Sequence, residues 1–216
     1  MLQSLREPIN GLTHFFAAIA AAIGLIALLV IGWKSVVKEI SLSIYGVSLI
    51  LLFAASAAYH LVDGKPQTIE ALRRFDHSAI YLLIGGTYTP FCIIMFSGFW
   101  KWGLLALIWS LALAGVSGEV MLRRAPRPLR VGVYVMMGWT CIAAIGEMLK
   151  VMPGGALAWL FAGGVLYTLG ALVYATRTLD FLPGKFGFHE VWHIFVILAA
   201  LAHFITIAVY VAPRGI

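Results

Sequence analysis

The chain has 216 residues, of which 62% are hydrophobic and 11% are charged, and its mean hydropathy is +0.98. Soluble globular domains are about 45–50% apolar and about 25% charged, so this composition excludes a soluble domain and indicates a polytopic membrane protein. The formal net charge of +6 does not indicate a nucleic-acid partner, because the basic residues lie in short loops between apolar segments, where they set topology and contact anionic headgroups.

Seven apolar segments are long enough to cross a bilayer, which takes roughly 17–25 helical residues. We therefore predict one all-α domain over residues 1–216 with seven transmembrane helices. The first segment is longer than the roughly 7–15 residues of a signal-peptide core, and we expect it to be retained as a helix. The predicted spans are residues 12–32, 40–61, 77–97, 102–121, 130–149, 156–176 and 190–211.

Lysine and arginine residues are unevenly divided between the two sides of this topology. Ten of the 15 fall in the N-terminal segment and in the second, fourth and sixth loops, whereas five fall on the other side. By the positive-inside rule, the N-terminus is expected in the cytoplasm and the C-terminus outside.

The two cysteines do not indicate a disulfide framework or a cysteine metal site. Cys92 and Cys141 both lie within predicted spans, and neither belongs to a CxxC or Cys/His spacing. We expect both to be buried free thiols.

The predicted topology brings polar residues from distant parts of the chain to one membrane depth. Polar groups at such a depth are costly, so each needs a partner or a function. Five of the six histidines are among them. The polar residues expected at the cytoplasmic ends of the helices are Asn10, Thr13, His14, Ser56, His60, Asp76, His77, His189 and His193.

The segment His189-Glu190-Val191-Trp192-His193 places two histidines on one helix face. Such a pair can hold a metal ion, most commonly zinc, or can hydrogen-bond backbone and headgroups at the interface; the other polar residues at this depth favour a metal. The letters also satisfy the HExxH pattern of zinc proteases, which take a further ligand downstream. No acidic residue follows Glu190, and His203 lies about 21 Å along the helix from His189, so a protease is disfavoured and His203 is interpreted as a packing residue.

His60 is the best candidate for a third ligand, because it ends the second predicted helix and shares a face with Ser56. Three histidines leave one zinc position open for water, as in catalytic sites. Asp76, near the start of the third predicted helix, is placed to hydrogen-bond or deprotonate that water. Alternatively, Asp76 occurs at this position because a negative charge is favoured by the dipole at a helix N-terminus.

The other polar residues at the helix ends are interpreted as structural. Asn10, Thr13 and His14 either hydrogen-bond the zinc ligands or, as we favour, tie the first helix to the last. Because His77 follows Asp76 directly, the two cannot face the same point, and His77 is expected to contact a metal ligand or to lie at the membrane interface. We expect Glu190 to cap its helix or pair with an arginine. The acids Glu119 and Glu147 are expected to be solvated or paired with Arg123 and Lys150.

Four motifs occur in order at the ends of the predicted helices: Glu7-Pro8-Ile9-Asn10-Gly11-Leu12-Thr13-His14, Ser56-xxx-His60, Phe75-Asp76-His77 and His189-Glu190-Val191-Trp192-His193. Through them nearly the whole chain resembles the hemolysin III proteins of the progestin and adipoQ receptor (PAQR) family. The short loops and small size look like those of a bacterial member. The resemblance therefore implies a multi-pass protein of the bacterial cytoplasmic (inner) membrane.

The resemblance also implies a zinc ion near the cytoplasmic side, held by His60, His189 and His193, with Asp76 contacting a zinc-bound water. The pattern is shared with alkaline ceramidases, which hydrolyse a lipid amide. Our leading hypothesis is a zinc-dependent hydrolase of a lipid amide or ester in membrane-lipid homeostasis, with Asp76 and Ser56 as catalytic residues and a lipid or fatty acid in a helical cleft.

Two other functions are compatible with the sequence. One is a non-enzymatic sensor or regulator of membrane state in which zinc is structural. The other is a haemolysin-like pore, although a pore needs polar residues along the middle of a span and the mid-span positions here are almost wholly apolar.

Overall fold

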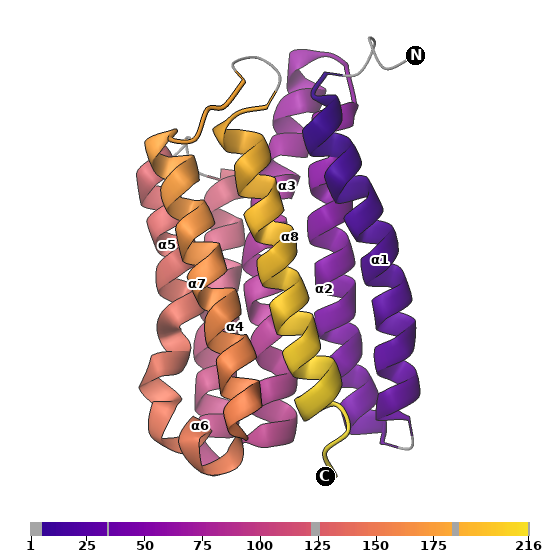
Figure 1. The fold of residues 1–216 in the computed structure, drawn as a ribbon, viewed down its shortest axis with the longest axis vertical. Coiled ribbons are helices and arrows are strands. Elements are labelled where there is room, and N and C mark those ends of the chain that lie inside the picture. Colours follow the sequence, from indigo (N-terminus) through magenta and orange to yellow (C-terminus); the bar gives the residue numbers. More distant parts are fainter. Residues whose placement is uncertain (1–5, 34, 122–125, 183–185, 216) are drawn as a thin grey trace.

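The structure is a computed structural model, and it describes residues 6–33, 35–121, 126–182 and 186–215. Within these ranges the chain is helical apart from connecting turns and a single bridge between Leu182 and Phe186. The helices form one bundle (Figure 1). They are α1 (Pro8–Gly32), α2 (Val36–Leu61), α3 (Pro66–Pro90), α4 (Gly98–Met121), α5 (Arg127–Trp139), α6 (Ile145–Val151), α7 (Gly154–Thr176) and α8 (Phe188–Thr206).

The prediction of seven transmembrane helices is confirmed. Seven helical stretches in the described ranges are long and apolar enough to cross a membrane, because α5 and α6 together make one span. The α3 and α8 spans continue as π-helical turns at Phe91–Met95 and Ile207–Val211. The two termini lie at opposite ends of the bundle, as an odd number of spans requires (Figure 1). Which end faces the cytoplasm stays a prediction.

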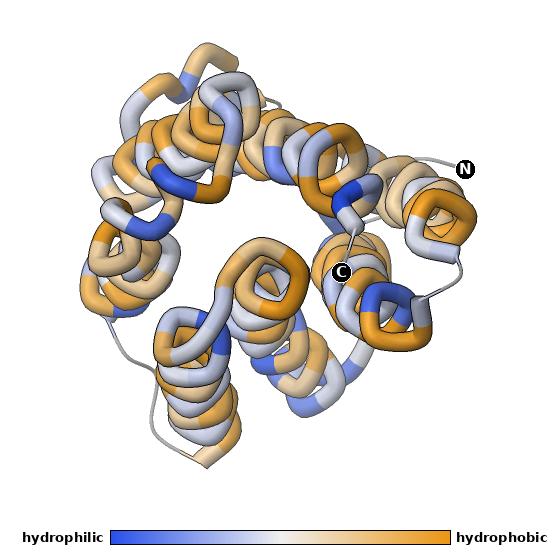
Figure 2. The backbone as a smooth tube through the Cα atoms, turned by 90° about the horizontal axis from the view of Figure 1, so that it is seen from below, coloured by the Kyte–Doolittle hydropathy of each residue, from blue (hydrophilic) through white to orange (hydrophobic). Residues whose placement is uncertain are grey.

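The outer faces of the helices are apolar. On α1, for example, the side chains of Phe16, Ile23 and Val30 are 64%, 64% and 70% exposed. A view along the bundle shows apolar residues on the helices around its circumference (Figure 2). Exposed hydrophobic residues in such numbers would be a liability in water, so these faces are the lipid-facing surface.

Helix α3 begins at Pro66, well before the predicted start of its span at residue 77. Its first turns are polar, and ion pairs at helical spacings stabilise them: Glu70 lies 2.8 Å from Arg73 and 3.1 Å from Arg74. Asp76 therefore lies in the third turn of a continuous helix. The helix dipole acts within the first turn, so the interpretation of Asp76 as a helix-terminal charge is wrong.

Close packing of α3 against α2 depends on Gly86. A Cβ atom at this position would collide with the Ser48 side chain and lie 3.2 Å from the Ile44 carbonyl oxygen. Helices in lipid associate mainly through such close backbone approach, because lipid tails are as apolar as the side chains they would replace. This contact holds α3 against α2, the helix that carries Ser56 and His60.

The fifth span is not the continuous helix predicted over 130–149, because a 3-10 turn at Thr140–Ala144 separates α5 from α6. The Tyr88 hydroxyl, from α3, satisfies the backbone here: it accepts from the Cys141 amide at 2.7 Å and donates to the Gly138 carbonyl at 2.8 Å. Irregular backbone at membrane depth requires such partners. Both cysteines are free as predicted, although Cys141 is only half-buried.

Candidate metal centre

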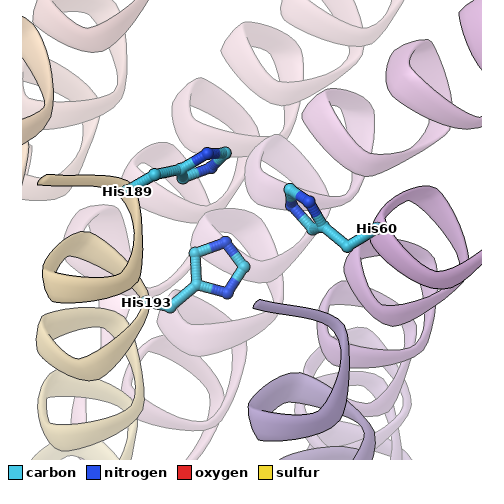
Figure 3. Close-up of side chains that lie close together, drawn as sticks. All are labelled: His60, His189 and His193. Atoms are coloured by element: carbon cyan, nitrogen blue, oxygen red, sulfur yellow. The ribbon is translucent and has the colours of Figure 1, made fainter. Parts of the chain in front are cut away.

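Three histidines from two helices converge at the end of the bundle that carries the N-terminus (Figure 3). The ring centroids of His60, His189 and His193 form a nearly equilateral triangle with sides of 4.8–5.0 Å, and each pair of rings is close to perpendicular. One ring nitrogen from each histidine lies within 4.8 Å of the other two. The structure thus brings together the three histidines that the sequence analysis proposed as metal ligands.

This donor set fits a divalent metal ion. Imidazole nitrogens on a tetrahedral zinc ion lie about 3.3 Å apart, so binding would draw the rings together by no more than about 1.5 Å. Nδ1 of His193 points away from the other two histidines, towards α1, so Nε2 is the ring nitrogen that His193 directs at the cluster (Figure 3).

The start of α8 is fixed by Glu190, so the orientation of His189 and His193 is fixed with it. One carboxylate oxygen of Glu190 accepts from the Gly187 amide at 2.8 Å, which caps the helix as expected. The other oxygen accepts from the Asn10 side chain of α1 at 2.8 Å. Asn10 therefore ties the first helix to the last, as the sequence analysis favoured.

Glu7, immediately before α1, holds His60 in place. Its backbone amide donates to the His60 carbonyl at 3.1 Å, and its carboxylate lies 2.6 Å from His60 Nδ1. The hydrogen bond with His60 lowers the pKa of Glu7 from 4.5 to about 2, so the residue is a carboxylate at neutral pH. With its Nδ1 hydrogen directed at Glu7, His60 presents the lone pair of Nε2 to the cluster, an arrangement common among metal-bound histidines.

His14 packs directly against the cluster without joining it. Its ring stacks on that of His193 with centroids 3.8 Å apart, and Phe53 contacts its edge at 5.0 Å. Both ring nitrogens of His14 are buried without a hydrogen-bond partner in the described part of the chain. His14 therefore restricts the rotation of His193 and links α1 to α8.

Asp76 and Ser56 lie beside the cluster. Both line the cavity onto which His189 and His193 open, and their side chains interact with each other. Asp76 is outside the group of three ligand atoms, so it is not positioned as a fourth direct ligand. Its role on a bound water, and that of Ser56, stay predictions.

The cavity runs from the histidine cluster into the bundle and has a volume of about 450 Å³. Beyond the cluster, apolar side chains from α3 to α7 line it, including Leu83, Phe91, Phe96, Met148 and Phe161. His203 also lines it, away from the cluster, and its ring hydrogen-bonds the Leu160 carbonyl oxygen at 3.2 Å. This fits the interpretation of His203 as a packing residue.

Glu119 differs from its prediction. Its side chain is only 9% exposed and lies 3.2 Å from Arg130 and 3.6 Å from His77, whereas solvation or pairing with Arg123 was expected. Arg123 lies outside the described residues. The end of α4 packs against α3, so a carboxylate there leaves water and needs cationic partners. Glu147 pairs with Lys150 at 3.6 Å, as expected.

Glu7 and Arg127 line the cavity, although neither residue had a predicted role in the site. Glu7 is 53 residues from His60, so no local spacing relates the two. The role of Glu7 could have been suspected from its position, because it is an acidic residue beside the first span, at the same end of the bundle as the histidines. Arg127 was counted only as a topology determinant.

Removing the charge of Glu7 should weaken metal binding. We expect Glu7→Gln to lower the affinity for Zn²⁺ by about 10–100-fold, because a ligating histidine loses the carboxylate that orients it and raises its basicity. Competition with a chromophoric chelator on the purified protein measures the change. Glu39→Gln, in the first turn of α2 at the opposite end of the bundle, is the matched control. Equal affinities for the two variants would contradict the role of Glu7.

Comparison with known proteins places the chain among characterised relatives. The family profile described as "Haemolysin-III related" matches residues 2–204. The chain is 35% identical to Hemolysin-3 of Bacillus cereus over all of its own length and 96% of the relative. It is 33% identical to the Hemolysin-3 homolog of Bacillus subtilis over 96% of its own length and 95% of the relative. The adiponectin receptor protein of Drosophila melanogaster is 30% identical over 77% of this chain and 41% of the receptor.

Proposed function

The chain belongs to the haemolysin-III-related family of multi-pass membrane proteins, and on that premise we propose that it is a zinc-dependent hydrolase of an amide or ester bond in a membrane lipid. Such an activity would serve membrane-lipid homeostasis. The observation that carries the proposal is the position of the histidine cluster: two of its members, His189 and His193, line the polar end of a cavity together with Asp76 and Ser56, and the remaining walls of this cavity are largely apolar.

The polar end of the cavity supplies the groups that hydrolysis needs. His60, His189 and His193 would hold the metal ion, and a Lewis acid at this position lowers the pKa of a water molecule to about 7 and polarises a carbonyl group. The Asp76 carboxylate accepts the proton of the attacking water. The Ser56 hydroxyl, on the same face of α2 as His60, donates a hydrogen bond to the developing oxyanion.

The apolar end of the cavity would hold an acyl chain. Ligand sites are typically apolar clefts of about 300–1,000 Å³ with a few polar groups that fix orientation, and the cavity of about 450 Å³ lies in this range. An acyl chain among Leu83, Phe91 and Met148 would direct its carbonyl group towards the histidines. The lipid would enter from the bilayer, where its chains already reside.

A regulator in which the metal is structural is the second candidate. It is favoured by the ties at the cluster, where Glu7, Asn10 and His14 join the first helix region to α2 and α8. A metal ion there would fix α2 and α8 relative to one another, and the first helix region is tied to both. A pore is disfavoured, because Leu83, Phe91, Phe96 and Met148, which line the cavity away from the histidines, are uncharged and apolar.

The test is turnover by the full chain in detergent or nanodiscs. Zinc-loaded protein incubated with a library of acyl lipids should release free fatty acid, which mass spectrometry detects. Release should stop on treatment with a strong chelator and return on addition of Zn²⁺. A zinc-loaded, folded protein that releases nothing from any amide or ester lipid would overturn the hydrolase and support the regulator.

A further inference from the structure

Three arginines line the polar end of the cavity beside the histidine cluster: Arg73, Arg127 and Arg130. Two of them are paired with carboxylates. Arg73 lies 2.8 Å from Glu70, and Arg130 lies 3.2 Å from Glu119. Each of these two guanidinium groups thus has a carboxylate partner within the protein.

Arg127 is different. Its guanidinium group lies over the rings of Tyr174 and Phe188, at 4.6 Å and 5.5 Å from the centroids, and no carboxylate forms an ion pair with it among the described residues. Its Nη1 atom is buried and has no hydrogen-bond partner in that part of the chain. Cation–π contacts stabilise a guanidinium group but do not satisfy its N–H donors, so a buried cationic donor is left available for an anion.

Arg127 is also close to the candidate metal centre. The Tyr174 ring that supports it lies 5.4 Å from the His189 ring, so one aromatic side chain separates the arginine from the cluster. A molecule with its carbonyl at the histidines and its acyl chain in the apolar cavity would therefore place its headgroup near Arg127. In a glycerophospholipid only a few bonds separate the ester carbonyl from the phosphate.

We propose that Arg127 is the headgroup site of the cavity and that it selects acyl lipids that carry a phosphate group. This rests on the proposed function and names the substrate class, a phosphate-bearing glycerolipid in place of a neutral lipid amide. Guanidinium groups bind phosphate through paired N–H donors, and such charge-assisted bonds are about twice as strong as neutral ones. A neutral headgroup would leave the Arg127 donor unpaired.

Binding of lipids that cannot be hydrolysed tests this independently of turnover. The probes are an ether-linked alkyl lysophosphatidate and the alkylglycerol with the same chain, which differ only in the phosphate. Native mass spectrometry of the full chain in detergent gives both affinities. We expect the wild type to prefer the phosphate-bearing lipid by about tenfold or more, the effect of one hydrogen bond to a charged group. Arg127→Gln should remove this preference while leaving alkylglycerol binding unchanged.

The control is Arg177→Gln, which removes an exposed arginine just after α7, at the same end of the bundle. It should retain the preference. An equal loss in both variants would show general surface attraction and overturn the proposal. Because the wild type's own preference needs no variant, misfolding of Arg127→Gln would not obscure the result: equal binding of the two probes to wild type overturns the proposal by itself.

Two further arms identify what holds the phosphate. The preference of the wild type for the phosphate-bearing lipid should persist after the metal is removed with a chelator. If chelation removes this preference while Arg127→Gln retains it, the metal and not Arg127 holds the phosphate, and the proposal is overturned. Inorganic phosphate should compete only weakly, since it lacks the chain. Displacement of the lipid by inorganic phosphate at comparable concentration would make this a site for free phosphate and not for a lipid. None of these binding measurements depends on hydrolysis, so the expected results can be obtained even if the protein has no turnover.

Discussion

Purified protein carrying His60→Ala should contain about a tenth or less of the zinc bound by the wild type. His60 is one of three histidines whose ligand atoms converge, and it alone comes from α2. Loss of a carboxylate that merely orients a ligand costs about 10–100-fold in metal affinity, so loss of the ligand itself should cost at least as much. Elemental analysis of protein purified without chelators, expressed as zinc per chain, measures the result.

The matched control is His203→Gln. His203 also lies in the bundle and lines the cavity, but its ring bonds the Leu160 carbonyl away from the cluster. Glutamine retains an N–H donor for that bond, so the variant should keep its zinc. Equal zinc content in wild type and His60→Ala would contradict the three-histidine site, whatever the protein's activity.

Asp76→Asn should abolish fatty-acid release while leaving the zinc content unchanged. Asparagine has the shape of aspartate but cannot accept a proton at neutral pH, and a positioned general base contributes about 10²–10⁴-fold to rate. The metal should stay because Asp76 lies outside the group of three ligand atoms. Release from the lipid that the wild type cleaves best, compared at matched zinc occupancy, gives the effect on kcat.

The control here is Asp63→Asn, which changes an exposed aspartate between α2 and α3 at the same end of the bundle. It should retain both zinc and activity. Two results would contradict the proposed role of Asp76: turnover near the wild-type rate in Asp76→Asn, which would exclude it as the base, or loss of zinc in that variant, which would make it a metal ligand.

Much of the architecture was predictable from the sequence because membrane insertion is decided locally. Each span needs a run of apolar residues of sufficient length, and all seven runs were identified. The pairing of His189 with His193 was equally local, since two residues four apart share a helix face. His60 could be added because the topology places the end of the second span and the start of the seventh on the same side of the membrane.

The boundaries that sequence analysis misjudged were those decided by polar contacts. The start of α3 at Pro66 lies beyond the apolar run, in turns where Glu70 pairs with two arginines. The 3-10 turn within the fifth span is supported by the Tyr88 hydroxyl from another helix. Hydropathy reports neither kind of contact.

The sequence by itself determined the number of spans, their approximate bounds and the three histidines at one depth. Only the tertiary structure decided the lateral neighbours: Glu7 against His60, Glu119 buried beside Arg130, and Arg127 at the cavity with no carboxylate partner among the described residues. The physical reason is that lipid tails and the bundle interior are similarly apolar, so hydrophobic periodicity does not show which face of a helix points inward. Close backbone approach and polar contacts between residues far apart in the chain select the neighbours, and they become visible only when the helices are packed.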